Sequence, residues 1–286
     1  MYLHSVKPNF EGNRIVNIKK FQQHVMDITT HTALCDSARA KAAKGENVVS
    51  LHSEKQHGFY FILTIICCGC GEKFNIDNSD KIGNENIQEI NLRCVWGNMV
   101  TGGGCSSLNE SMGTMGIPGI NERTYSKIEG QIGKLWNDVL QDEMKQAGEE
   151  EKRIAIENDE YFQGVPAIAV VCDGGWSKRS HKHTYNAMGG VGVIFGLKTK
   201  KLLHIGIRNK LCYICSRAAT KNQEPVKHEC FKNWEQSSQS MESDIILEGF
   251  RECEKKYGLR YMQMIADGDS SVYATIIKNI PIWGQR

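Results

Sequence analysis

The chain has 286 residues, 40% of them hydrophobic, and its 35 Lys and Arg against 33 Asp and Glu give a net charge of +2. This composition supports packed cores in a chain long enough for two domains, and it excludes a wholly disordered protein. The most apolar run, residues 59–68, is too short to cross a membrane, and residues 1–20 are too polar for a signal peptide, so no membrane partner is predicted.

Cysteine content and charge distribution narrow the function further. Eleven cysteines without a predicted secretory signal favour reduced thiols and metal sites over disulfides. Residues 1–160 carry 17 Lys and Arg against 22 Asp and Glu, whereas residues 161–286 carry 18 against 11. The second part of the chain is therefore net basic, which indicates a polyanionic partner.

The first elements along the chain predict a small α+β region. Residues 14–34 contain a helical pattern whose apolar face carries Phe21 and Ile28. Residues 39–57 are polar and are predicted to be irregular or to lie on the surface. Residues 59–68 then predict a buried strand, because a short apolar run bounded by glycines is typical of one.

This strand leads into a predicted zinc site. Cys67 and Cys70 have the C-x-x-C spacing of a metal-binding turn, and His31 and Cys35 lie one helical turn apart, so that both can face it. Three thiolates and one imidazole form a tetrahedral zinc set, which would hold the first helix onto the strand. Two alternatives stay open: unoccupied, buried thiols, or a different pair of partners for the C-x-x-C turn. That rival pair is Cys94 and Cys105.

Residues 121–160 have the strongest helical pattern of the sequence. Asn121 or Thr124 can cap it, since both side chains can accept a hydrogen bond from the first helical turn. Apolar residues then recur at helical spacing: Ile128, Ile132, Leu135, Trp136, Val139 and Leu140. We expect a long connecting helix whose acidic run, Glu149–Glu151, faces solvent.

The stretch Val165–Trp176 predicts the central strand of the second half. Small and β-branched apolar residues follow Pro166 and end on Asp173, Gly174 and Gly175. An acid at the end of a buried strand, beside glycines that let a phosphate backbone approach, is suited to bind a divalent cation. The alternative is an Asp-Gly turn without a ligand.

Basic residues and two further strands follow. The loop after the central strand contains Lys178, Arg179 and Lys182, which are suited to contact the phosphates of a polyanionic partner. Residues 188–197 and 201–207 predict two strands that continue a meander, because the connections are short.

The segment 210–233 predicts a second zinc site. Cys212 and Cys215 form a C-x-x-C pair, and His228 and Cys230 follow after a polar loop. Four ligands within so short a segment are typical of a structural zinc ion, whereas chance clustering in a cysteine-rich chain is the alternative.

Two more elements complete the predicted core. A helix capped by Ser240 has Glu242 in its first turn. Residues 259–266 predict a strand that delivers Asp267, with Asp269 two residues later. The order of strand, two strands, insertion, helix and strand matches an α/β, ribonuclease-H-like fold with a mixed sheet. In that fold two acids end adjacent strands and hold metal ions for phosphodiester chemistry.

At these residues the sequence resembles the transposase domain of Mutator-like elements. The resemblance joins several motifs in one order: Asp173–Arg179, Cys212/Cys215 with His228/Cys230, Asn233-Trp234, Ser237-Ser238, Met241-Glu242, Gly258–Tyr261 and Asp267–Ser270. Two N-terminal features are similar to the same family: the His31/Cys35 and Cys67/Cys70 pattern, and the segment from Trp96 to Gly104. Together these motifs cover most of the chain.

The resemblance implies a DDE-type transposase that cleaves and joins DNA ends with Mg²⁺ or Mn²⁺. Asp173 carries over as the first acid and Asp267 as the second, with Asp269 as a close rival. The third acid is expected on a later helix, but no Asp or Glu follows Asp269, so a C-terminally truncated core is expected. Glu242 is either a metal ligand or a helix N-terminal carboxylate favoured by the macrodipole.

These expectations combine into three regions and three candidate functions. The regions are 1–120 with a zinc knuckle, a connecting helix at 121–160, and a partial ribonuclease-H-like core at 161–286 with its zinc insertion at 210–233. The functions are a transposase or a fragment of one, an inactive zinc-containing DNA-binding protein derived from a transposon, and a ribonuclease-H-type nuclease that uses Asp173, Glu242 and Asp267. DNA and a second copy of the chain are the expected partners, and the nucleus is the expected location.

Overall fold

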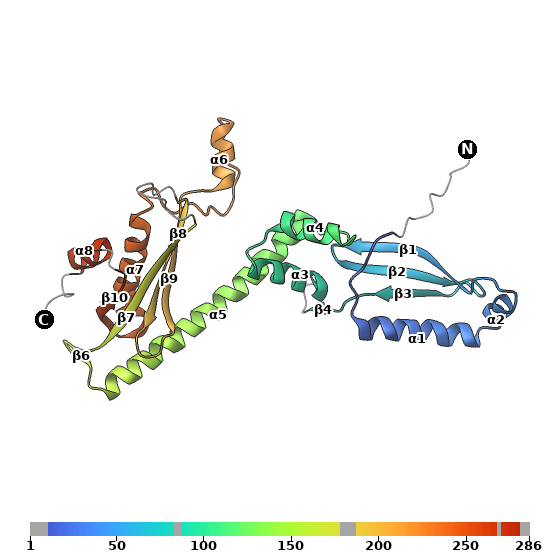
Figure 1. Ribbon diagram of the computed structural model, residues 1–286, viewed down its shortest axis with the longest axis horizontal. Coiled ribbons are helices and arrows are strands. Elements are labelled where there is room, and N and C mark those ends of the chain that lie inside the picture. Colours follow the sequence, from blue (N-terminus) through green and yellow to red (C-terminus); the bar gives the residue numbers. More distant parts are fainter. Residues whose placement is uncertain (1–10, 83–86, 178–186, 268–269, 281–286) are drawn as a thin grey trace. The chain divides into compact units, whose positions relative to one another are not determined.

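The computed structural model describes four stretches of the chain: 11–82, 87–177, 187–267 and 270–280. The chain divides into two compact units, Met1–Trp136 and Asn137–Arg286, and the long helix α5 (Glu122–Glu157) contributes to both (Figure 1). Among the described residues, no helix combines the length and the apolar character that crossing a bilayer requires.

The first unit combines helices with short antiparallel strands. Its helices, besides the start of α5, are α1 (Ile18–Leu34), α2 (Asp36–Ala43), α3 (Glu89–Val100) and α4 (Cys105–Thr114). Its strands are β1 (Val49–His57), β2 (Tyr60–Cys67), β3 (Lys73–Asp77), β4 (Lys81–Ile82) and β5 (Ile87–Gln88). The strands β1, β2 and β3 form one antiparallel sheet, and β4 pairs with β5.

The core of the first unit lies where α3, α4 and the start of α5 meet. Its buried members include Phe59, Val95, Leu108, Tyr125, Ile128 and Ile132. The predicted cap of α5 is confirmed, since Asn121 Oδ1 accepts the N–H of Thr124 at 2.8 Å. Further along α5, Leu135 and Val139 are about half exposed, so the apolar stripe of this helix is not buried throughout.

The polar segment 39–57 lies largely on the surface, which was one of its two expected forms, but it is regular rather than irregular. It contains most of α2 and all of β1. β1 pairs with β2 from Val49 opposite Cys67 to His57 opposite Tyr60, with one irregularity. β1 is an edge strand with mostly exposed side chains, so backbone pairing rather than apolar patterning holds it in place.

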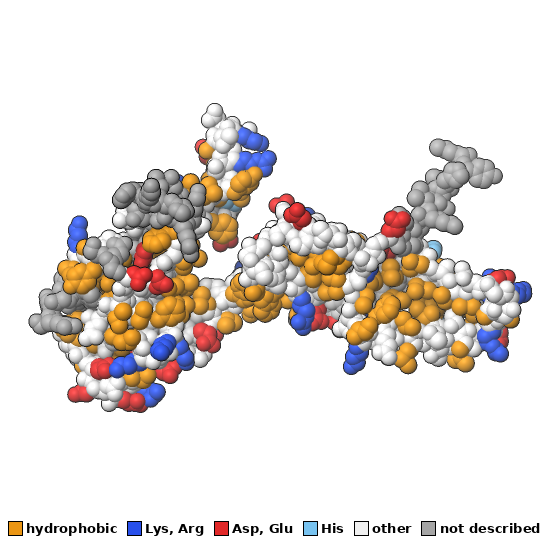
Figure 2. Space-filling view, in the orientation of Figure 1, with side chains coloured by type: hydrophobic (Ala, Val, Ile, Leu, Met, Phe, Trp, Pro, Cys, Tyr) orange, Lys and Arg blue, Asp and Glu red, His pale blue; other side chains and the backbone are white. Residues whose placement is uncertain are grey.

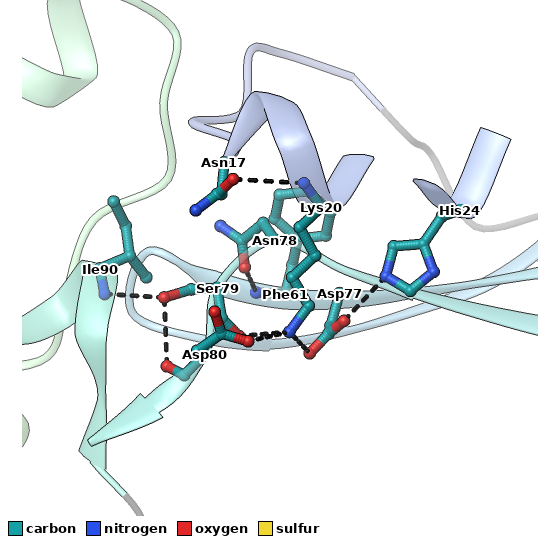
Figure 3. A network of polar contacts seen from close by, with 9 residues as sticks. All are labelled: Asn17, Lys20, His24, Phe61, Asp77, Asn78, Ser79, Asp80 and Ile90. Atoms are coloured by element: carbon teal, nitrogen blue, oxygen red, sulfur yellow. Dashed lines mark hydrogen bonds and ion pairs between the residues drawn. The ribbon is translucent and has the colours of Figure 1, made fainter. Parts of the chain in front are cut away.

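None of the residues of α1 is fully buried, and polar contacts help to attach this helix to the sheet. Lys20 Nζ lies 2.9 Å from Asp77 Oδ2 and 2.7 Å from Asp80 Oδ1 (Figure 3). His24 Nε2 lies 3.0 Å from Asp77 Oδ1. Burial by itself would raise the pKa of Asp77, but the hydrogen bonds from Lys20 and His24 outweigh it and lower that pKa.

A buried amide joins the segment before α1 to the sheet. Asn78 is 2% exposed, and its Nδ2 donates to the carbonyls of Ile15 and Phe59, each at 2.8 Å. Its Oδ1 accepts the N–H of Phe61 at 3.0 Å. The Asn78 side chain thus satisfies backbone groups that strand pairing leaves open.

The second unit is built on a mixed sheet. Its strands are β6 (Tyr161–Phe162), β7 (Val165–Trp176), β8 (Gly189–Gly196), β9 (Leu202–Asn209) and β10 (Arg260–Ile265). They are ordered β10-β7-β8-β9, and β6 pairs with the start of β7. The antiparallel meander β7-β8-β9 is confirmed, and β10 lies parallel to β7 on its other side.

The helices of the second unit are α6 (Tyr213–Thr220), α7 (Ser240–Tyr257) and α8 (Ser270–Asn279), with the end of α5. Of these, α7 packs along the sheet, and α8 packs on α7. Two glycines let α7 approach closely, because a methyl group added at Gly192 or Gly206 would lie 2.8 or 2.6 Å from Ile245 Cγ2. The buried core includes Ala147, Ile168, Val170, Ile194, Leu203, Ile246, Phe250, Leu259 and Ile276.

The ends of α7 differ in part from expectation. Ser240 is its first residue rather than its cap, and Gln239 holds the cap position without a side-chain hydrogen bond. Ser237 Oγ instead accepts the N–H of Ser240 at 3.3 Å. Gly258 ends the helix as predicted, in the left-handed conformation with φ 61°.

The acidic run in α5 is not wholly solvated, and the expectation for Glu151 was wrong. Its side chain is 0% exposed, and Oε1 accepts from Thr199 N at 2.7 Å and from Thr199 Oγ1 at 2.8 Å. Glu151 therefore ties α5 to the turn between β8 and β9. Gly196 makes room for it, since a methyl group there would lie only 2.1 Å from Glu151 Oε1.

Candidate metal centres and carboxylate cluster

The first metal-binding group lies between α1 and the turn that joins β2 to β3. His31 and Cys35 come from the end of α1, and Cys67 and Cys70 come from the turn. One ligand atom from each lies within 4.8 Å of all the others. Cys70 Sγ is 3.3 Å from His31 Nε2, and Cys67 Sγ is 4.0 Å from Cys35 Sγ. Three sulfurs and one imidazole nitrogen at this spacing could bind zinc.

The turn prepares one thiol for a metal. Backbone N–H groups of Cys70 and Gly69 point at Cys67 and outweigh its burial, which lowers the pKa of Cys67 to about 6. A thiolate is the form that binds metal. The rival ligand Cys105 lies elsewhere, with its Sγ 3.8 Å from Ile120 O, and Cys94 packs beside the core of the first unit.

Gly69 makes the close contact between this turn and α2, and we expect Gly69→Ala to weaken metal binding. The added methyl group would lie 2.4 Å from Ala38 N, a backbone atom that cannot move alone. Overpacking of this kind costs about 1–3 kcal/mol, which corresponds to a fall in zinc affinity of roughly fivefold to 150-fold. A competition titration with a chelator measures it, and Gly97→Ala, with open space at its Cβ, serves as the control. Equal affinities for the two variants would contradict this account of the turn.

The second metal-binding group follows β9. Cys212 and Cys215 flank the start of α6, and His228 and Cys230 return from the loop after it. The four ligand atoms lie within 4.8 Å of one another. His228 Nε2 is 3.1 Å from Cys212 Sγ and 3.4 Å from Cys215 Sγ, and Cys215 Sγ is 3.6 Å from Cys230 Sγ. The predicted convergence is confirmed, and this group too could bind zinc.

The surroundings suit a metal at this group as well. The N–H of Cys215 is the main cause that lowers the pKa of Cys212 to about 6. The carbonyl of Val226 lies 2.7 Å from His228 Nδ1, which orients the ring and leaves Nε2 toward the sulfurs. That carbonyl and the neighbouring thiols raise the pKa of His228 to about 9, so a metal ion would displace a proton from this ring.

The sequence suggested that Asp173 lies at the end of the strand, but in the structure it lies within β7. The strand continues to Trp176, because Gly174 and Gly175 still pair with β8. The parallel partner β10 ends earlier, with Ile265 opposite Val171. Asp173 is therefore exposed at a point where β7 extends past the pair.

Asp267 occupies the corresponding place after β10. It follows Ile265 by two residues, as Asp173 follows Val171, and it too is exposed. The two aspartates thus lie at the same end of neighbouring parallel strands, whose backbones are about 4.8 Å apart.

A third carboxylate, that of Glu242, lies against β7. A methyl group added at Gly174 would be 2.4 Å from Glu242 Cδ and 2.6 Å from its Oε2. The carboxylate thus occupies the space left by the residue next to Asp173. The neighbouring thiol of Cys172 has its pKa raised to about 12 by burial and by the charge of Glu242.

Comparison with known proteins decides the family. A family model described as Mutator-like transposase matches residues 12–284. This chain belongs to the Mutator-like transposase family. No curated protein and no solved structure matched in the corresponding comparisons.

Part of the site predicted for this transposase lies outside the described residues. That part comprises Asp269 and the basic residues Lys178, Arg179 and Lys182. The structure describes both Cys/His groups and the three residues Asp173, Glu242 and Asp267, of which Asp267 is the last residue of its described stretch.

Sequence reasoning found ligands in the transposase chain but missed the residues that make room for them. Gly69 admits the backbone of α2 beside the first metal group, and Gly174 admits Glu242 beside Asp173. A glycine next to each ligand was the available signal. It could not be interpreted without knowing which element approaches it.

Proposed function

We propose that this Mutator-like transposase domain binds DNA and cleaves its phosphodiester backbone, with divalent cations held by Asp173, Asp267 and Glu242. One observation carries the proposal. The parallel pair of β7 and β10 brings two aspartates to one end of the sheet, and α7 presents Glu242 at the residue next to the first of them. The three carboxylates thus come from three elements at one end of the sheet.

The topology of the second unit supports a ribonuclease-H-like core. A meander of three antiparallel strands is followed by a helix and by a fourth strand that pairs in parallel with the first. The insertion with the second metal group falls between the third strand and the helix. This order is the one on which the acids of such a core depend, because it places the first and fourth strands side by side.

The donor set fits a hard divalent cation. Carboxylate oxygens are the ligands that Mg²⁺ and Mn²⁺ accept, and such ions stabilise charge on the oxygens of a phosphate during displacement. Asp173 and Asp267 are exposed and so accessible to a DNA phosphate. Cys172, with its pKa near 12, stays a neutral thiol and does not compete for the ion.

The position of Glu242 bears on which residue supplies a third carboxylate. The sequence left open whether Glu242 could reach the two aspartates, and a chain without a third carboxylate would bind DNA and cleave it poorly. In the structure its carboxylate lies against Gly174, so Glu242 is close to the strand that carries Asp173, and this closeness is what supports a metal-ligand role. Strand transfer to a second DNA site belongs to the same proposal, since the same chemistry serves both steps.

Cleavage of DNA by the purified chain tests the proposal. Nicking of a supercoiled plasmid with Mg²⁺ or Mn²⁺ is expected, and Asp173→Ala or Asp267→Ala should abolish it. Glu252→Gln, which removes an acid from an exposed pair on α7, should cleave like the parent chain. DNA binding without metal-dependent cleavage would leave the inactive DNA-binding protein as the better description.

A further inference from the structure

The second metal group belongs to an arm that leaves the sheet at the end nearest the carboxylates. The zinc arm is defined here as residues 210–233, which comprise α6 and the segment that returns from it. It follows β9 after Asn209, which lies opposite Gly189, while the next residue of β8 pairs with Trp176 of β7. The arm therefore begins at the end of the sheet toward which β7 runs past Asp173 (Figure 1).

The base of the zinc arm is fixed to the sheet. Asn233 Oδ1 accepts the N–H of Asn209 at 2.6 Å, and Asn233 Nδ2 donates to Ile207 O at 2.9 Å. Trp234 N donates to Asn209 O at 3.1 Å, and the Arg208 guanidinium lies 5.8 Å from the Trp234 ring. With the four metal ligands within the arm, these contacts hold α6 in a defined position relative to the sheet.

The surface of α6 is basic and free of acids. No residue of this helix is buried. Residues 208–223 contain four Lys or Arg and no Asp or Glu. Tyr213, Arg217 and Lys221 are spaced four residues apart and share one face of the helix, and Tyr213 is 74% exposed. Figure 2 shows basic and hydrophobic side chains gathered at the α6 end of the second unit.

Two exposed cations on this face, Arg217 and Lys221, are available to a partner of opposite charge. Arg217 and Lys221 form no ion pair within the part of the chain that the structure describes. A symmetric contact between two copies would bring the same basic face against this one, and the like charges would repel. A polyanion fits, and an Arg and a Lys beside an exposed aromatic ring are the side chains that DNA-binding surfaces use.

We propose that α6 is a DNA-contacting helix, held by zinc so that it engages the same duplex that the carboxylates act on. The inference rests on the proposed function and adds a DNA-binding element, α6, beside the proposed cleavage site. The stripe from Tyr213 to Lys221 is about 12 Å long at 1.5 Å per residue, and the major groove, about 12 Å wide, admits an α-helix. Arg217 and Lys221 would contact phosphates or base edges, and Tyr213 would pack against the sugar–phosphate backbone.

The test is binding of a fluorescent 30-base-pair duplex of random sequence, measured by anisotropy over a range of salt concentrations. The Arg217→Ala/Lys221→Ala variant should bind roughly tenfold more weakly near 100 mM salt. The slope of log affinity against log salt should fall by about two, because two phosphate contacts are lost. The matched control, Lys255→Ala/Lys256→Ala, removes two cations at the C-terminal end of α7. There Tyr257 contacts Leu203 near the start of β9, whereas the zinc arm follows the end of that strand. The control should bind within about twofold of the parent chain.

The possible results distinguish a failure of the α6 role from a failure of the proposed function. Zinc content and mass in solution are measured for every variant, so that loss of the arm itself is detected. Equal losses in the two paired variants, or no loss in either, would overturn the role of α6 while leaving DNA binding and cleavage intact. A parent chain that binds no duplex would overturn the proposed function as well. A Tyr213→Ala variant that changes oligomeric state but not DNA affinity would assign this face to a protein contact and refute the inference.

Discussion

Replacing Glu242 by Gln is expected to reduce metal-dependent DNA cleavage by roughly 100-fold or more while leaving DNA binding unchanged. Loss of one preorganised electrostatic group at an active site has effects of this size. The amide keeps the shape of the side chain but loses the charge that would hold a cation. As a helix-end carboxylate alone, Glu242 would contribute only about 0.3–1 kcal/mol to stability and nothing to the reaction. Unchanged cleavage by Glu242→Gln would therefore return it to that role.

A backbone variant gives an independent test of the same carboxylate. Gly174→Ala places a methyl group 2.4 Å from Glu242 Cδ, so the carboxylate must move from its place against β7. Gly175→Ala is the matched control, because its methyl group would be 3.4 Å from Val191 Cγ1, an ordinary contact. We expect cleavage to fall in the first variant and to persist in the second. Similar rates in both would show that the position of Glu242 does not matter to the reaction.

Removal of zinc is expected to have the largest effect on structure. Neither α1 nor α6, the two helices that carry metal ligands, buries a residue fully, so neither has a core of its own to hold it. Structural zinc contributes on the order of 10 kcal/mol or more in small metal-dependent domains, which equals the whole stability of many domains. Chelation should therefore release the zinc arm and α1 together, observed as new proteolytic cuts in both.

Variants that lack a single metal ligand should each release one of the two segments, the zinc arm or α1. The parent chain is expected to hold about two equivalents of zinc, since two complete ligand groups are present. Cys215→Ser should remove about one equivalent and expose the zinc arm to protease while α1 stays protected. Cys67→Ser should do the reverse. Zinc content that is unchanged in either variant would exclude the corresponding site.

Motifs that are local in the chain were predictable from the sequence. Cys212, Cys215, His228 and Cys230 fall within one short segment, so ligand spacing alone identified the group that the structure brings together. The first group was harder, because Cys94 and Cys105 were rival partners. Helical spacing of His31 and Cys35 pointed to the correct pair, since residues one turn apart share a face.

Sheet order was also within reach of the sequence, for a topological reason. Short connections force β7, β8 and β9 into a meander, and a helix between β9 and β10 allows the last strand to return parallel to the first. That arrangement brings Asp173 and Asp267 to one end of the sheet, as expected. The role of the two acids in catalysis stays a prediction.

Only the tertiary structure decided contacts that depend on how one element lies on another. Glu151 belongs to a run of acids, and its burial follows from the docking of α5 onto the turn at Thr199, which periodicity does not encode. The closeness of Glu242 to Gly174 follows from the packing of α7 on the glycines of β8 and β9. Helical and strand periodicity specify which face of an element is apolar. They do not specify the translation and angle at which two faces meet, and those values set the distance between side chains that are far apart in sequence.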